Sequence, residues 1–150
     1  MEDVKFTKVR GVKTPTRATK FAAGIDLFVP EDFATVTLNH GDSVLIPSGL
    51  KFLIPASYAL VANNKSGVAV KKGLTFGAAV IDSDYHGEAH IHLIKSTSGS
   101  TTIVAGEKIV QFLLEKQEYS TLTEVATETE LYADVDSDRG DRGFGSTGVS

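Results

Sequence analysis

The segment His90-Ile91-His92-Leu93-Ile94 assigns its side chains alternately to two faces of an extended chain. His90, His92 and Ile94 share one face and Ile91 and Leu93 share the other, because successive side chains of a β-strand point to opposite sides. The same period of two recurs elsewhere, in Leu50-Phe52-Ile54, Val4-Phe6, Val36-Leu38 and Val44-Ile46. This periodicity predicts half-buried strands.

Turn-forming residues separate these segments at intervals of roughly 8–12 residues, which is typical of an all-β sandwich or barrel. They include Pro30, Pro55, Asn63-Asn64, Lys72-Gly73 and Ser98-Gly99-Ser100. No long amphipathic helix is evident, and residues 59–67 have room for one or two helical turns. Residues 115–138 are predicted to form a polar, acidic connection with one or two short strands.

Composition limits the function classes. The 150 residues fit one globular domain, with 41% hydrophobic and 23% charged residues. No cysteine is present, which excludes disulfides, thiolate zinc sites and a cysteine nucleophile. The net charge of −4 argues against stable nucleic-acid binding. No apolar run approaches the roughly 18 residues of a membrane span, and the opening Met-Glu-Asp-Val-Lys lacks a signal-peptide core, so we expect an intracellular protein without membrane contact.

A candidate site lies in Ile81-Asp82-Ser83-Asp84-Tyr85-His86-Gly87-Glu88. The segment resembles the start of a calcium-binding loop, but it lacks that loop's later acidic ligands, since His86 and Leu93 occupy their positions. We interpret it as a hairpin that presents Asp82, Asp84 and Tyr85. The alternative is that its aspartates only stabilise the turn.

Two other segments carry polar residues among apolar ones. Asp26, within Ala23-Gly24-Ile25-Asp26-Leu27, needs a backbone donor or a group of cations if it is half-buried. Asn63-Asn64-Lys65-Ser66-Gly67 suits either the start of a helix or a phosphate contact. A histidine metal site is not favoured, because His90 and His92 simply share one strand face.

The C-terminal Gly143-Phe144-Gly145-Ser146-Thr147-Gly148 matches the spacing of a dinucleotide-binding loop, but only two residues follow it, so the required helix is missing. A phosphate-binding arm is the other interpretation, in which glycine backbone, the hydroxyls of Ser146 and Thr147, and the guanidinium groups of Arg139 and Arg142 contact the anion. An unstructured tail is the alternative. Phe144 favours the arm, because an exposed aromatic ring can stack on a base.

Five segments, in this order, resemble the five motifs of the homotrimeric dUTPases, from about Ala23 to Gly148. They are Ala23-Gly24-Ile25-Asp26-Leu27, Lys65-Ser66-Gly67, residues 80–88, Gly106-Glu107-Lys108-Ile109-Val110-Gln111, and residues 139–148. The resemblance implies an all-β, jelly-roll-like barrel or sandwich that forms a homotrimer. It divides the chain into a β-rich domain (1–138) and a flexible glycine-rich arm (139–150) that closes over an active site built from three chains.

The resemblance also implies an activity, the hydrolysis of dUTP to dUMP and pyrophosphate, which limits uracil incorporation into DNA and supplies dUMP for dTMP synthesis. Asp82 would be the base that activates water for attack on the α-phosphate. Tyr85 would pack against the deoxyribose, and the backbone of residues 73–79 would read the uracil edge. The implied substrate-binding residues are Lys65, Ser66, Gly67, Tyr85, Gln111, Arg139, Phe144, Gly145, Ser146 and Thr147.

Mg²⁺ is the implied cofactor, held mainly by the triphosphate and reached by Asp26 through water. The chain departs from the family pattern at Lys65, where arginine is usual, at Asn64, where proline is usual, and at Ala79 and Arg142, where glycine is frequent. Two alternatives remain at this level: a dCTP deaminase-related enzyme, and a regulatory protein whose binding to an unknown partner depends on the nucleotide.

Overall fold

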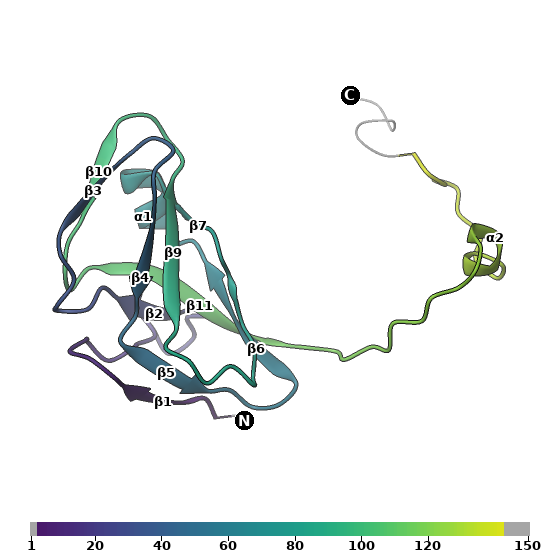
Figure 1. Ribbon diagram of the computed structural model, residues 1–150, viewed down its shortest axis with the longest axis horizontal. Coiled ribbons are helices and arrows are strands. Elements are labelled where there is room, and N and C mark those ends of the chain that lie inside the picture. The colour runs from purple at the N-terminus through teal and green to yellow at the C-terminus, as the bar shows by residue number, and fades with distance from the viewer. Residues whose placement is uncertain (1–2, 143–150) are drawn as a thin grey trace. The chain divides into compact units, whose positions relative to one another are not determined.

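The computed structural model describes residues 3–142 and is built mainly of short strands (Figure 1). The elements are β1 (Lys5–Lys8), β2 (Ile25–Phe28), β3 (Val36–Asn39), β4 (Ser43–Pro47), β5 (Leu50–Leu53), β6 (Tyr58–Asn63), α1 (Ser66–Lys72), β7 (Leu74–Phe76), β8 (Val80–Ile81), β9 (His90–Lys95), β10 (Ser100–Ile103), β11 (Lys108–Lys116) and α2 (Glu128–Leu131). The all-β class expected from the alternation and the jelly-roll-like fold implied by the resemblance are both confirmed.

The strands form four small antiparallel sheets, and most partners are distant in sequence. The largest has the order β2-β11-β6-β8, the next has the order β4-β9-β7, and the pairs β1-β5 and β3-β10 complete the set. The long strand β11 joins β2 and β6 within the largest sheet. Because strands of one sheet come from opposite ends of the chain, residues far apart in sequence meet at the strand ends.

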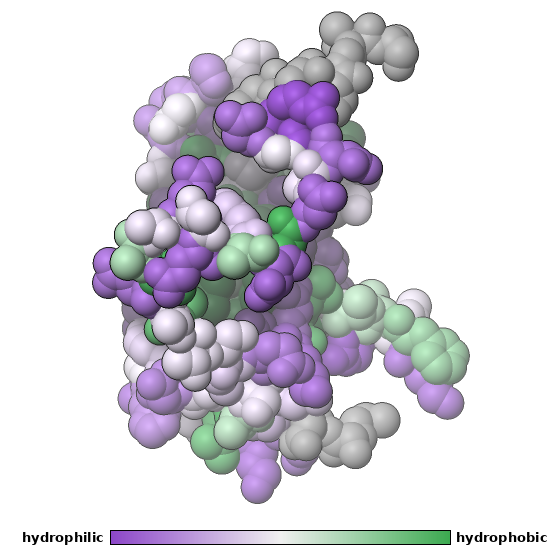
Figure 2. Space-filling model, turned by 90° about the vertical axis from the view of Figure 1, so that its right-hand side faces the viewer, coloured by the Kyte–Doolittle hydropathy of each residue, from purple (hydrophilic) through white to green (hydrophobic). Residues whose placement is uncertain are grey.

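Strand β9 has the two faces that the sequence predicts. Ile91 and Leu93 are buried, whereas His90 is exposed and His92 is half-buried. Strand β5 shows the same alternation, with Leu50 and Phe52 inside. These side chains belong to a single hydrophobic core that also contains residues of β2, β4, β6 and β11. On the face shown in Figure 2, hydrophilic side chains surround smaller hydrophobic patches.

The hairpin expected at residues 81–88 does not form, and residues 73–79 do not form one either. β7 pairs with β9, β8 pairs with β6, and β9 pairs with β4 and β7, so neither β7 with β8 nor β8 with β9 makes a pair. Both segments instead cross from one sheet to another. A turn signal in the sequence marks a change of direction, but it does not reveal which strand the next segment will join.

The short strands expected within residues 115–138 are absent from the described chain beyond the end of β11. Strand β11 extends to Lys116, and the regular element beyond it is the helix α2. Thr127 caps this helix by accepting a hydrogen bond from the Glu130 N–H at 3.2 Å, and Glu130 accepts one from the Ala126 N–H at 3.1 Å. The sequence Thr127-Glu128-Thr129-Glu130 is thus a capping-box signal that the strand interpretation overlooked. Strand β10 was also missed, because its start coincides with the Ser98-Gly99-Ser100 turn.

The chain divides into two compact units, residues 1–118 and 119–150. The first unit holds every strand of the described chain and every predicted site residue up to Gln111. The division expected at residue 138, with an arm from residue 139, stays a prediction. No helix among residues 3–142 has the length and apolar character needed to cross a lipid bilayer.

Leu50 and Leu53 give a matched test of the core. Leu50 is completely buried and Leu53, on the opposite face of β5, is 56% exposed. Leu50→Ala should lower the free energy of unfolding by about 2–5 kcal/mol, because it removes buried methyl groups and leaves a cavity. Leu53→Ala should change it by about 0.5 kcal/mol or less. Urea titrations of both variants measure the difference, and equal losses would contradict the assigned strand faces.

Candidate active site

The buried carboxylate of Asp26 is the centre of one cluster of predicted residues. Asp26 lies in β2 and is 2% exposed. Lys65 donates to Oδ1 at 2.8 Å, and Lys108 Nζ lies 3.1 Å from Oδ2. Lys108 is at ion-pair distance without hydrogen-bond geometry, and no other residue in 3–142 donates to Oδ2. The cation network expected around Asp26 is therefore present, and it joins the first, second and fourth motifs.

Gln111 fixes the geometry beside this cluster. In β11 it pairs with Asp26 on one side and with Asn63 on the other. Its side-chain amide donates to the Asn64 carbonyl at 2.8 Å, immediately before Lys65. The side chain also crosses the face of Gly24, where an added Cβ would lie 2.2 Å from Oε1 of Gln111. A side chain at residue 24 would have to displace this amide.

Ser66 and Gly67 begin helix α1, so the helix-start interpretation of this segment is correct. Lys65 occupies the N-cap position, but its side chain makes no capping hydrogen bond and turns to Asp26 instead. Ser66 and Gly67 are both exposed, and a Cβ added to Gly67 would meet nothing within 4 Å. Packing within the chain therefore does not explain the glycine, which costs about 1 kcal/mol relative to alanine inside a helix.

Asp82 and Tyr85 lie together in a second cluster. They line a pocket of about 200 Å³ with Ala78, Ala79 and His90. Both side chains are exposed, and a turn joins them through the Tyr85 N–H, which donates to the Asp82 carbonyl at 3.2 Å. An acidic group thus stands beside an aromatic ring at the edge of a largely apolar hollow, an arrangement suited to a base that faces a bound molecule.

Within one chain the structure does not bring the two clusters together. In the sheet order β2-β11-β6-β8, Gln111 and Ile81 flank β6 on opposite sides. Gln111 pairs with Asn63, whereas Ile81, next to Asp82, pairs with Leu60. Three residues along a strand span about 10 Å, so the clusters lie toward opposite ends of β6.

The segment expected to read a base edge is held by its own chain. The Phe76 N–H donates to Oδ1 of Asn64 at 3.0 Å, the Gly77 N–H to the His92 carbonyl at 2.9 Å, and the Ala78 N–H to Nδ1 of His92 at 2.9 Å. These contacts also occupy His92, so this ring supports the backbone. Of this segment, Ala78 and Ala79 line the Asp82 pocket. Ala79, one of the departures noted in the sequence, therefore lines this pocket.

The described residues do not form a metal cage. Residues 3–142 contain no group of three or more His, Cys, Asp or Glu side chains placed to hold an ion. Oδ2 of Asp26 has ligand capacity, but two lysines lie within 3.1 Å of this carboxylate. Their charges oppose direct binding of Mg²⁺ by Asp26. The residues present thus do not fit a metal ion held by protein ligands alone.

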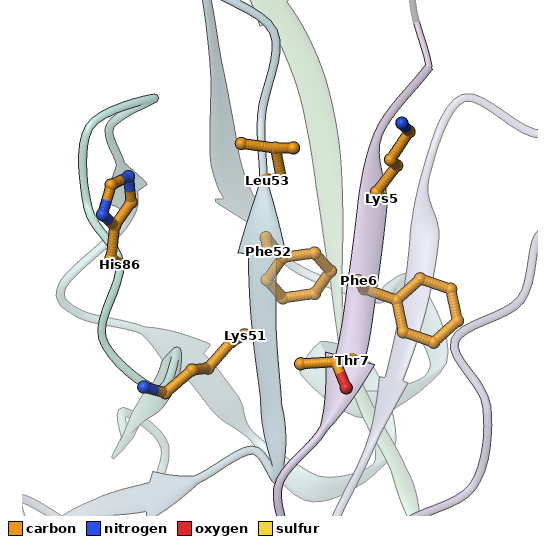
Figure 3. Close-up of a pocket in the computed structure, with 7 residues that line it drawn as sticks. All are labelled: Lys5, Phe6, Thr7, Lys51, Phe52, Leu53 and His86. Carbon is orange, nitrogen blue, oxygen red and sulfur yellow. The ribbon is translucent and has the colours of Figure 1, made fainter.

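A larger hollow of about 330 Å³ lies elsewhere, on the β1-β5 sheet (Figure 3). Phe6, Phe52 and Leu53 form its apolar part, and Lys5, Lys51 and His86 also line it. None of the predicted catalytic or binding residues lies in it. We therefore assign the candidate site to the smaller pocket, because that pocket holds the acidic group.

The predicted arm is described only at its start. Arg139 is exposed and donates through Nε to the Arg142 carbonyl at 2.7 Å, and Arg142 returns a hydrogen bond to the Arg139 carbonyl at 2.9 Å. Phe144, Gly145, Ser146 and Thr147 lie outside the described residues. Their assignment as substrate-binding residues stays a prediction.

Sequence reasoning missed four residues of these clusters. Lys108 lies inside the fourth motif, but nothing in its spacing shows that it reaches Asp26. Gly24 lies in the first motif, but only the structure shows that the Gln111 side chain occupies the space beside it. Arg10 and Glu88 form a bidentate pair beside the Asp82 loop. They are 78 residues apart in the chain, so no local pattern connects them.

Comparisons with known proteins agree with this geometry. A family model described as dUTPase matches residues 10–148. The deoxyuridine 5′-triphosphate nucleotidohydrolase of Desulfotalea psychrophila is 39% identical over 153 residues, covering 97% of each chain. The solved dUTPase of Staphylococcus bacteriophage 80alpha with dUpNHpp has a TM-score of 0.84 at 25% identity, covering 99% of this chain and 100% of that one. A dUTPase of S. aureus phage phi11, described with a structural Mg(II) ion, has a TM-score of 0.73 at 21% identity, covering 85% and 99%.

The contact between Gly24 and Gln111 predicts a coupled stability effect. Gly24→Ala should lower the free energy of unfolding by about 1–3 kcal/mol, because its methyl group overlaps the Gln111 amide. Adding Gln111→Ala removes the obstructing group, so the double variant should lose less than the sum of the two single variants. Urea unfolding of the three variants measures the coupling. Strictly additive losses would contradict the close approach of Gly24 and Gln111.

Proposed function

This chain belongs to the dUTPase family, and we propose that it hydrolyses dUTP to dUMP and pyrophosphate with Asp82 as the catalytic base. The observation that carries the proposal is the exposed carboxylate of Asp82 beside Tyr85 in the 200 Å³ pocket, in a chain that the family model matches from residue 10 to residue 148. Removal of dUTP limits uracil incorporation into DNA, and the product dUMP supplies dTMP synthesis.

Asp82 accepts a proton from a water molecule that attacks the α-phosphate. A carboxylate in this role must be accessible to water and ionised, and Asp82 is exposed. The Asp82 carbonyl accepts a hydrogen bond from the Tyr85 N–H, so the turn fixes the position of the base relative to the aromatic ring. Tyr85 packs against the sugar where a 2′-hydroxyl group would clash. Ala78 and Ala79 contribute the wall near the uracil ring.

The Asp26 cluster supplies the phosphate-binding half of the site. Ser66 and Gly67 are exposed at the start of α1, and the unexplained glycine at residue 67 leaves room for close approach of a phosphate to the backbone. Lys65 and Lys108 place two positive charges here, which Asp26 partly neutralises. Gln111 positions the Asn64 carbonyl and so the turn that carries Lys65. Arg139, Phe144, Gly145, Ser146 and Thr147 complete the site from the arm.

Divalent metal ions are used in this family, and for this chain we assign Mg²⁺ to the substrate. The protein residues do not fit direct coordination, so the ion arrives with the triphosphate as part of the substrate complex. Held by the triphosphate, such an ion would neutralise charge that otherwise repels the attacking water. Two lysines hold the Asp26 carboxylate, so Asp26 would reach the ion only through water.

The separation of the two clusters supports a homotrimer. Asp82 with Tyr85, and Ser66 with Gln111, lie toward opposite ends of β6 in one chain. A closed threefold ring brings one cluster of each copy against the other cluster of its neighbour and completes three equal sites. The third contribution is the arm. Assembly is therefore a requirement for activity in this proposal.

The comparisons favour the diphosphatase over a dCTP deaminase-related enzyme, because the matching family model and relatives are dUTPases. No observation in the described residues favours a purely regulatory binding protein. An intracellular location remains a prediction from the sequence, and it fits a substrate that belongs to the pool of DNA precursors.

Asp82→Asn tests the base. We expect kcat for dUTP to fall by about 10²- to 10⁴-fold with KM little changed, because the amide keeps the shape of the side chain but cannot accept the proton. Asp84→Asn, in the same exposed loop, is the matched control and should retain nearly full turnover. Pyrophosphate release measures both. Unchanged turnover in a folded Asp82→Asn protein would refute the assignment.

Mixing two inactive proteins tests the shared site. Asp82→Asn carries an intact arm, and a chain truncated after Asp138 carries an intact Asp82. Co-refolding equal amounts should restore roughly one quarter of the sites, since half of the positions supply a good base and half supply a good arm in a random threefold ring. Native mass spectrometry verifies that mixed trimers have formed. If mixed trimers form without activity, base and arm come from the same chain.

A further inference from the structure

We propose that Arg10 and Glu88 form an ionic clamp that positions Tyr85 and so sets the preference for 2′-deoxyribose over ribose. This inference rests on the proposed function, because it assigns specificity within the same site. Neither residue lines the Asp82 pocket, and both act through Tyr85. They are therefore positioning residues.

The Glu88 carboxylate is held at both oxygens. Arg10 donates through Nε to Oε1 at 2.8 Å and through Nη2 to Oε2 at 2.9 Å. The Gly49 N–H also donates to Oε1 at 2.8 Å. The Glu88 side chain is 17% exposed and the Arg10 side chain 32%. A bidentate pair of this kind, partly shielded from water and supported by a backbone donor, fixes the position of its residue far better than a single surface ion pair.

The backbone carbonyl of the same residue holds the wall of the pocket. The Tyr85 hydroxyl donates to the Glu88 carbonyl at 3.0 Å, and Nδ1 of His90 lies 2.9 Å from the same oxygen. Tyr85 and His90 both line the pocket that contains Asp82. Since a carbonyl oxygen can accept two hydrogen bonds, Glu88 serves both side chains at once. Movement of Glu88 would therefore move Tyr85.

Two glycines make this arrangement possible. The Tyr85 ring folds across Gly87, where an added Cβ would lie 2.3 Å from the Tyr85 hydroxyl oxygen. Gly49 has a positive φ of 77°, and an added Cβ there would lie 2.7 Å from Cγ of Arg10. Arg10 thus lies against Gly49 on one side of Glu88, and Tyr85 lies against Gly87 on the other. Both approaches exclude any larger residue.

The clamp is charged throughout the working pH range. Hydrogen bonding from Arg10 lowers the pKa of Glu88 below its ordinary value of 4.5, and burial opposes this effect only in part. Donation to Glu88 raises the pKa of the Arg10 guanidinium. The stability that the pair contributes is lost only as the pH falls through the lowered pKa of Glu88. Selectivity that depends on the clamp should therefore not vary near neutral pH.

The discrimination itself depends on distance. A wall that rejects one hydroxyl group must lie in van der Waals contact with the sugar, and retreat by a fraction of an ångström admits the larger ribose. Tyr85 is 45% exposed, so packing around its ring leaves it free to move once its hydroxyl group is released. Loss of the clamp should thus raise activity on UTP relative to dUTP more than it lowers turnover of dUTP.

Steady-state kinetics of the full chain with dUTP and with UTP, in the presence of Mg²⁺, tests the clamp. Glu88→Gln removes the charge, and Tyr85→Phe removes the hydroxyl group. Each should lower the ratio of the two kcat/KM values by roughly 3- to 10-fold, the effect of one lost hydrogen bond. Both changes break the same link between Glu88 and Tyr85. The ratio in the double variant should therefore fall no further than in the more affected single variant.

Asp32→Asn is the matched control. Asp32 accepts from Nη1 of Arg10 at 3.0 Å but does not contact Glu88, and its side chain is 59% exposed. This variant should keep the wild-type ratio. Arg10→Lys keeps the charge but loses the two parallel hydrogen bonds, so its ratio should fall between those of wild type and Glu88→Gln. If Glu88→Gln shows no cooperative thermal transition, Arg10→Lys and Tyr85→Phe carry the test.

A second measurement does not require turnover. The chain has four tyrosines, so protein labelled with ¹³C-tyrosine gives a simple NMR spectrum. The signal that is missing from the spectrum of Tyr85→Phe belongs to the Tyr85 ring. Glu88→Gln should shift that signal, and Asp32→Asn should leave it in place. An unchanged signal, or an unchanged selectivity ratio in folded Glu88→Gln, would overturn the clamp. A wild-type protein that releases no pyrophosphate from dUTP while the Tyr85 signal responds to Glu88→Gln would refute the proposed function and the selectivity role, and would leave only the positioning of Tyr85 by Glu88.

Discussion

The buried charge of Asp26 is the constraint that fixes how β2, β11 and the end of β6 meet in the largest sheet. A carboxylate with 2% exposure is tolerated only with cations beside it, and here Lys65 and Lys108 provide them. The two lysines come from the loop after β6 and from the start of β11, so the ion pairs hold the ends of three neighbouring strands together. The positions of Lys65 and Lys108, and of the turn before Ser66, therefore depend on this one buried charge.

Glu88 has a comparable role at the other cluster. Its carboxylate joins the N-terminal segment to the β4-β5 turn through Arg10 and Gly49, and its carbonyl holds the side chains of the Asp82 pocket. Both clusters thus use an acidic side chain to hold in place residues that the proposed function assigns to the substrate. Shielding a charge from water costs free energy, but a fully paired charge holds its partners in fixed positions.

Distance along β6 connects the chemistry to assembly. The strand separates Gln111 from the Asp82 loop by about 10 Å of backbone and places them on opposite sides, so in the proposed trimer each chain would contribute to two different sites. In the proposed homotrimer, neighbouring copies would supply the walls of the site that a single chain lacks.

The sequence by itself determined the class of fold and the family. Alternation such as Ile91 and Leu93 depends only on the period of a strand, and the ordered motifs name Asp82, Ser66 and Gln111 as candidates. Only the tertiary structure decided which strands pair, since β8 joins β6 rather than β9, and it alone showed Lys108 at Asp26 and Arg10 at Glu88. The ion pairs Lys108–Asp26 and Arg10–Glu88 join residues 82 and 78 positions apart, and their geometry arises from sheet order, which no local pattern encodes.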